Sequence, residues 1–168
     1  SFWRERPALI LFWRHYGCGC GIERAGMLNR EHAVYRDAGA DVVIVGQGEP
    51  DRAAAYAQKY ELPPISILCD PEFQAYEAYG LLEGKPSQIL FDAPQEFLDR
   101  DYDAGLKLAE ERRERDRPLV DNGWLLPGEF VIDRTGIVRL AYRYNYCEDF
   151  PDHRVLAAAI REAKIGVP

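Results

Sequence analysis

Residues 8–28 read ALILFWRHYGCGCGIERAGML and join two elements of different kinds. The run Ala8–Trp13 is continuously apolar, which is typical of a strand buried on both faces. Beyond the cysteines, one stripe of residues recurs at three- and four-residue steps until Gly39, a natural helix stop. The stripe consists of Ile22, Ala25, Leu28, His32 and Tyr35. The stretch therefore predicts a core strand followed by an amphipathic helix of about four turns.

The chain then alternates strand-like and helix-like segments. Residues 41–46 (DVVIVG) and 64–70 (PISILCD) are strand-like, and the segments 49–60 and 71–80 have the composition and end signals of helices. Counted from Ala8, the order is βαβαβα. This order implies parallel strands with helices on the faces of the sheet.

The C-terminal part adds a hairpin and a closing helix. Residues 128–143 (GEFVIDRTGIVRLAYR) predict two strands around the tight turn DRTG, and residues 149–165 predict a helix. Between about 82 and 126 the pattern breaks, which we interpret as a mainly helical insertion. We expect it to fold, as a lid or partner surface, over the edge of the sheet where Cys18 lies. The prediction is an α/β fold with a central mixed sheet in one domain, residues 1–168.

Composition narrows the function classes. The net charge is −7 and the pI is near 5.0, so the chain lacks the basic surface that nucleic acids or anionic membranes require. No apolar run approaches the roughly 20 residues of a membrane span, and the N-terminus lacks the cleavage site of a signal peptide. Four scattered cysteines favour a reducing cytoplasm. Because the chain starts at Ser1 without Met, we expect that an N-terminal segment has been removed.

The Cys18 thiol is placed where a helix begins. Backbone N–H groups of a first helical turn stabilise an anion, so the pKa of this thiol should lie below the free value of about 8.5. Gly17, Gly19 and Gly21 let the backbone turn sharply and should leave the sulfurs of both Cys18 and Cys20 uncovered. His15 would orient or deprotonate Cys18 or be an ordinary loop residue, and Arg14 would favour the thiolate or only balance charge.

Three stretches resemble a known family. They are FWRHYGCGCGIERAGML, ILCDPEFQAYEAYGL and LPGEFVIDRTGIVRLAYR, which together are similar to the peroxiredoxin-like branch of the alkyl hydroperoxide reductase / thiol-specific antioxidant (AhpC/TSA) family. The resemblance covers nearly the whole chain and implies a thioredoxin-like fold. It also implies that Cys18 is the nucleophilic cysteine and that Pro127 is the cis-proline set beside it.

The chain departs from that family at three places. Members of the branch often carry Cys-x-x-Cys, but here Gly21 rather than Cys20 stands at the second cysteine position. True peroxiredoxins have a Thr three residues before the reactive cysteine, where this chain has His15. They also have an Arg before the strand that Phe130 opens, where this chain has Pro127 and Gly128. The usual peroxide-activating set is therefore absent.

Together these features predict a peroxiredoxin-like thiol oxidoreductase without an organic cofactor. Cys18 would attack a peroxide or a disulfide, a second thiol such as Cys20 would resolve the product, and a thioredoxin-like protein would restore the thiols. A homodimer is one expected assembly. The alternative is a Cu or Zn site, or a metalloid site, that uses Cys18 and Cys20 with His15 or Cys147. A third option is a binding module without activity.

Strand direction also predicts a position for Cys147. The strand before it should return to the end of the sheet that holds Cys18, so we expect an accessible Cys147 in the active site as a further thiol or as the third metal ligand. The alternative is that Cys147 is a surface cysteine with no role. Cys69 closes a parallel strand in an apolar context, which favours a buried and inert thiol.

Overall fold

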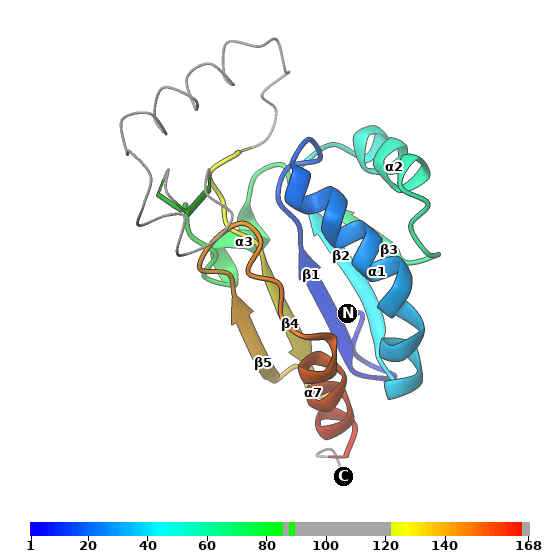
Figure 1. Cartoon of the computed structure of the whole chain (residues 1–168). Coiled ribbons are helices and arrows are strands. Elements are labelled where there is room, and N and C mark those ends of the chain that lie inside the picture. Colours follow the sequence, from blue (N-terminus) through cyan, green and yellow to red (C-terminus); the bar gives the residue numbers. More distant parts are fainter. Residues whose placement is uncertain (86–87, 90–121, 166–168) are drawn as a thin grey trace, which may run out of the picture.

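A five-stranded mixed sheet forms the centre of the computed structural model, which describes residues 1–85, 88–89 and 122–165 (Figure 1). The strand order is β3-β2-β1-β4-β5. The strands are β1 (Ala8–Phe12), β2 (Asp41–Gly46), β3 (Ser66–Cys69), β4 (Gly128–Ile132) and β5 (Val138–Arg143). The sheet confirms the predicted α/β fold class with a thioredoxin-like arrangement.

The central strand is β1, as its unbroken apolar run predicted. It pairs in parallel with β2, with Ala8 opposite Asp41, and antiparallel with β4, with Ala8 opposite Ile132. Its side chains alternate between two core clusters, because Leu9 and Leu11 face one side of the sheet and Ile10 and Phe12 face the other. Burial on both faces explains why the strand lacks polar residues.

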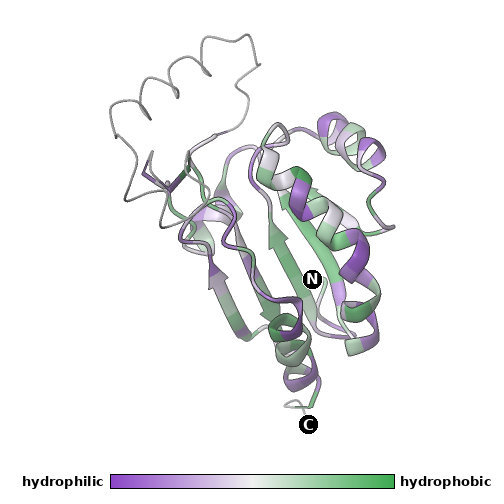
Figure 2. Cartoon of the chain, viewed as in Figure 1, coloured by the Kyte–Doolittle hydropathy of each residue, from purple (hydrophilic) through white to green (hydrophobic). Residues whose placement is uncertain are grey.

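Helices cover both faces of the sheet. The helices are α1 (Gly19–Ala38), α2 (Pro50–Lys59), α3 (Gln74–Ala78) and α7 (His153–Ile165). Leu28 of α1 and Ile160 of α7 pack in the core cluster that contains Leu9, whereas Tyr76 of α3 packs with Phe12 on the opposite face. Figure 2 shows that β1 and β2 are largely apolar, whereas the helices carry both hydrophilic and hydrophobic residues.

The inward face of α1 differs from the predicted stripe. Ile22 is 41% exposed, whereas Arg24 is only 5% exposed and lies among the buried residues. The prediction for Ile22 was wrong because Arg24 takes the inward position and pairs there with Glu129 of β4. The predicted stop is correct, since Gly39 caps the helix with φ 105°, a left-handed conformation that favours glycine.

The ends of the predicted insertion are joined to each other. Glu83 and Leu125 form an antiparallel bridge, and the Leu126 N–H donates to the Leu82 carbonyl at 3.1 Å. These ends lie beside the carboxyl end of β1, as the next section shows. The body of the predicted helical insertion and lid, residues 90–121, lies outside the described residues.

In the part of the chain that the structure describes, no helix has both the length and the apolar character needed to cross a membrane.

Candidate active site

Cys18 and Cys20 lie where the loop after β1 ends and α1 begins. The Trp13 N–H donates to the Val45 carbonyl at 2.8 Å, which continues the β1 pairing one residue beyond the strand. The chain then turns, and Cys18 becomes the N-cap of α1, with its carbonyl accepting from the Ile22 N–H. The half-buried Cys18 therefore has the position at the helix start that its sequence context predicted.

Cys18 and Cys20 are joined by a disulfide in the structure. Their Cα atoms are 5.4 Å apart, within the range that disulfides span. Cys18 is partly exposed, but Cys20 is buried in the first turn of α1 among the core residues, so the prediction of an uncovered Cys20 sulfur was wrong. The two sulfurs thus differ in access, and a large reactant meets Cys18 first.

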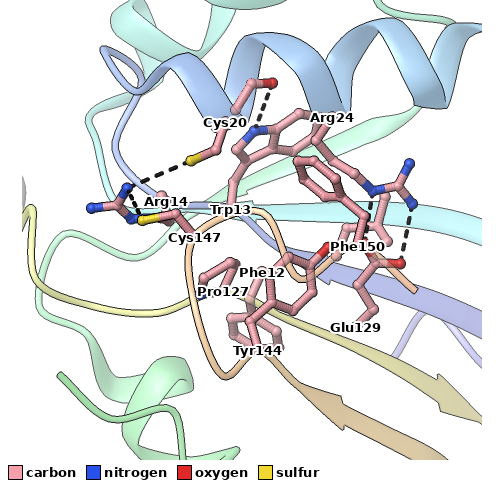
Figure 3. A pocket seen from close by; sticks show the side chains of 12 residues that line it. Phe12, Trp13, Arg14, Cys20, Arg24, Pro127, Glu129, Tyr144, Cys147 and Phe150 are labelled. Atoms are coloured by element: carbon pink, nitrogen blue, oxygen red, sulfur yellow. Dashed lines mark hydrogen bonds and ion pairs between the residues drawn. The ribbon is translucent and has the colours of Figure 1, made fainter. Parts of the chain in front are cut away.

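Arg14 brings a positive charge to the sulfurs. Its Nη1 atom donates to Cys18 Sγ at 2.9 Å, to Cys147 Sγ at 2.9 Å and to Cys20 Sγ at 3.5 Å. Its other two nitrogens donate to backbone carbonyl groups. Nε donates to the Leu125 carbonyl at 3.2 Å, and Nη2 donates to the Gly123 carbonyl. The side chain is 4% exposed, so its charge acts in a poorly solvated place. Figure 3 shows the guanidinium beside the sulfurs of Cys20 and Cys147, with a dashed line to each.

Cys147 lies at this end of the sheet, but it is not accessible. The residue is 2% exposed, so the prediction of an accessible thiol was wrong. It is buried because residues 88–89, at the N-terminal end of the insertion, pack over it. The Cys147 N–H donates to the Gln88 carbonyl at 3.0 Å, and its Sγ donates to the Ile89 carbonyl at 3.1 Å.

Cys69 ends β3, an edge strand, and is half-buried rather than fully buried as predicted. An edge strand has an uncovered side, which explains the difference. Partial burial and, to a smaller degree, the nearby Glu49 carboxylate raise the pKa of this thiol. Both effects disfavour the thiolate, in keeping with the inert role that its context predicted.

Pro127 lines a small pocket beside the cysteines, as the resemblance implied, but its peptide bond is not cis. None of the described residues has a cis peptide bond. The trans form is the lower in energy for most X–Pro bonds. Here it is compatible with hydrogen bonds on both sides, because the Leu126 N–H bonds Leu82 and the Pro127 carbonyl accepts from the Tyr144 N–H at 3.1 Å.

His15 shapes the turn that presents Cys18. Its Nδ1 accepts from the Gly17 N–H at 3.2 Å, and its carbonyl accepts from the Cys18 N–H at 3.2 Å. Its Nε2 faces Gly123, where an added Cβ would lie 3.9 Å away. These contacts give His15 a structural place next to the thiol.

The sequence prediction missed a buried ionic network on the floor of the pocket. Arg24 donates to Glu129 through Nε at 2.7 Å and Nη2 at 3.1 Å, and the Tyr144 hydroxyl donates to the same carboxylate at 2.6 Å. Burial lowers the pKa of Arg24, but the contact with Glu129 overcomes this and raises it well above its usual value. Burial, and then Glu129, raise the pKa of Tyr144. The available signal was Glu129 itself, a charge at the head of the apolar strand segment GEFVI.

The pocket connects the sulfurs with this network (Figure 3). Trp13 forms one wall, and its indole N–H donates to the Gly21 carbonyl at 3.3 Å. Phe12, Pro127, Tyr144 and Phe150 also line the pocket and contribute apolar surface to it. Cys20 and Cys147 both line the pocket.

As for a metal site, no group of three or more His, Cys, Asp or Glu residues within the described ranges is arranged to hold an ion.

Comparisons with known proteins agree with this picture. A curated relative, the chloroplastic thioredoxin-like protein AAED1 of Arabidopsis thaliana, is 29% identical over 84 residues, which is 50% of this chain and 34% of the relative. The match thus spans about a third of the length of that relative.

Two solved structures share the fold. The Xanthomonas campestris bacterioferritin comigratory protein has a TM-score of 0.62 at 12% identity, with 95% of this chain and 81% of that chain covered. Peroxidoxin BcpB from Mycobacterium tuberculosis has a TM-score of 0.60 at 13% identity, with 93% and 79% covered. The family model for AhpC/TSA antioxidant enzymes matches residues 27–146, from within α1 to the loop after β5. Since this match covers well over half of the sequence, the chain belongs to the AhpC/TSA antioxidant enzyme family.

Proposed function

We propose that the protein is a thiol-dependent oxidoreductase that reduces peroxides or disulfides through Cys18. The observation that carries this proposal is the place of the Cys18 sulfur, at the start of α1 and 2.9 Å from the Arg14 guanidinium. A helix N-terminus and an adjacent cation both stabilise a thiolate, the nucleophilic form of cysteine. Family membership supports the same chemistry.

With a peroxide, the Cys18 thiolate attacks one oxygen and the O–O bond breaks. The products are a Cys18 sulfenic acid and an alcohol, or water from hydrogen peroxide. The Cys20 thiol then attacks the sulfenic sulfur, which releases water and forms the disulfide found in the structure. With a disulfide substrate, Cys18 first forms a mixed disulfide, and Cys20 displaces the substrate thiol.

The cycle closes with an external reductant. We propose a dithiol protein of the thioredoxin type, which would attack the partly exposed Cys18 sulfur and accept the disulfide. This step requires a reducing compartment, and the cytoplasm is our proposed location. The chemistry needs no organic cofactor.

Arg14 also argues against the metal alternative. Its guanidinium contacts the sulfurs of Cys18, Cys20 and Cys147, which are three of the four candidate ligands of the Cu or Zn site, the fourth being His15. A cation already placed between these ligands repels a second one. The same charge assists a thiolate, so the arrangement favours redox chemistry.

A peroxide-consumption assay with an external dithiol tests the proposal. We expect Cys18→Ser to lower the rate to that of the uncatalysed reaction, because the attacking atom is lost. Cys20→Ser should still consume peroxide once per chain and then accumulate a sulfenic acid at Cys18. The matched control is Cys69→Ser, which removes a thiol outside the site and should retain activity. Full activity of Cys18→Ser would overturn the proposal.

A further inference from the structure

We propose that Cys147 is a third redox thiol, which takes over the disulfide from Cys18 and stores it as a buried Cys20–Cys147 bond. This inference rests on the proposed function, because Cys18 and Cys20 must first be oxidised. It starts from one contact. The Cys20 and Cys147 sulfurs lie 3.5 Å and 2.9 Å from the same atom, Arg14 Nη1, so they are at most the sum of these two distances apart.

The burial of the three sulfurs selects the bond that forms. Cys20 and Cys147 are both buried and both line the pocket, whereas Cys18 is half-exposed and faces the start of the helix. An attack by Cys147 on the Cys20 sulfur would take place inside the pocket. External thiols meet Cys18 instead.

The choice of leaving group also favours an attack by Cys147 on Cys20, with Cys18 as the thiolate that leaves. When a thiolate attacks a disulfide, the sulfur that is better stabilised as an anion leaves faster. Cys18 has both stabilising features, since it caps α1 and receives an Arg14 N–H bond at 2.9 Å, shorter than the 3.5 Å to Cys20. The Cys18–Cys20 disulfide also has only one residue between its two cysteines, so it closes a small ring. An attack by Cys147 on Cys20 opens this ring.

The step balances as a simple thiol–disulfide exchange. The Cys147 S–H first gives up its hydrogen bond to the Ile89 carbonyl and loses its proton to solvent. The Cys147–Cys20 bond forms, the Cys18–Cys20 bond breaks, and Cys18 leaves with the electron pair as a thiolate beside Arg14. Oxidation state is conserved, because one disulfide replaces another.

The result is a nucleophile restored without any reductant. Cys18 would then react with a second peroxide and become a sulfenic acid, while the first oxidising equivalent stays in the pocket. A reduced chain should therefore consume two equivalents of peroxide, whereas Cys147→Ser should consume one and stop at the Cys18–Cys20 disulfide.

The experiment titrates fully reduced protein with hydrogen peroxide under anaerobic conditions. After each equivalent, the native protein is alkylated, the disulfides are mapped by peptide mass spectrometry, and sulfenic acid is trapped with dimedone. After one equivalent we expect a Cys20–Cys147 disulfide and an alkylated Cys18. After two equivalents we expect a dimedone adduct on Cys18.

Two variants serve as controls. Cys147→Ala repeats the Cys147→Ser test without a hydroxyl, and Cys69→Ser should behave as the unaltered chain does. A Cys18–Cys20 disulfide that persists in the unaltered chain, with Cys147 still a thiol, would overturn the inference while leaving the proposed function intact. If Cys18 stays reduced throughout, the proposed function itself fails. Because the mapping uses the unaltered chain, a variant that does not fold leaves the test decisive.

Discussion

Arg14 has five hydrogen-bond partners, because its side chain contacts three sulfur atoms and two backbone carbonyl groups from distant parts of the chain. Its guanidinium joins Cys18 and Cys147 to the backbone at Gly123 and Leu125. A planar group with several fixed donors can do this, whereas an ammonium group offers only a point charge. Arg14 is thus a positioning residue as well as an electrostatic one.

Replacing Arg14 should slow Cys18. For reduced Arg14→Met we expect the alkylation rate of Cys18 at neutral pH to fall about tenfold or more. A nearby positive charge stabilises the ionised form of an acidic group and lowers its pKa by roughly one to three, so its removal leaves less thiolate. Arg14→Lys should lose less of the rate, because the charge remains. Iodoacetamide kinetics with peptide mapping measure the effect.

The exposed Arg161→Met provides the matched control for charge removal. A Cys18 rate that is equal in Arg14→Met and Arg161→Met would contradict the role of Arg14.

Cys69 should react more slowly than a free cysteine, in contrast to Cys18, because its pKa is raised. Its raised pKa means that less thiolate is present near pH 8 than for a free cysteine, so its alkylation should be slow there and should accelerate as the pH rises. Glu49→Gln removes the smaller of the two causes and should increase the rate at a given pH. A rate near pH 8 equal to that of a free cysteine would contradict the assignment.

At the scale of the element, the helix α1 combines a redox terminus with a buried ion pair one turn later. Apolar periodicity predicted the helix, its Gly39 stop and the strands on either side, because these follow from local pattern. Periodicity could not place Arg24 inward, since its partner Glu129 is 105 residues away in sequence. The burial of Cys147 was missed for the same reason, because its cover comes from residues 88–89.

The ion pair itself should be costly to break. In Glu129→Leu, the buried Arg24 loses its main partner, and the free energy of unfolding should fall by about 3–5 kcal/mol. The double variant Arg24→Met with Glu129→Leu should recover part of this loss, because the buried guanidinium that kept only Glu31 as a charged partner is then removed as well. Urea denaturation followed by circular dichroism measures both.

Arg36→Ala is the control, since it breaks an exposed pair with Asp37 and should change stability by at most about 1 kcal/mol. A loss in Glu129→Leu no larger than in this control would show that the pair contributes little.

On the scale of the whole molecule, the sheet order places the segment after β5 beside the segment after β1. Strand direction alone predicted that Cys147 returns to the Cys18 end, and the resemblance placed Pro127 there. The contact through Arg14 required the fold, because it depends on backbone carbonyls at the second end of the insertion.

A disulfide from Cys20 to Cys147 should stabilise the whole fold. It would close a loop of roughly 130 residues and restrict the unfolded chain, which corresponds to about 4–5 kcal/mol in the loop-entropy treatment. After one equivalent of peroxide, the unaltered chain should therefore resist guanidinium better than equally oxidised Cys147→Ser, whose disulfide spans one residue. Equal unfolding midpoints would contradict a long-range bond.

The distance along the chain between Arg14 and Cys147 also sets an order of events during synthesis. The two residues are 133 positions apart, and ribosomes add about 5–20 residues per second, so the cysteines at the start of α1 leave the ribosome on the order of ten seconds before Cys147 does. During that interval β4, the neighbour of β1, is also absent. The nascent chain therefore carries Arg14, Cys18 and Cys20 before the Gly123 and Leu125 carbonyls that hold the guanidinium are made, and the reactive centre is complete only after Cys147 has emerged.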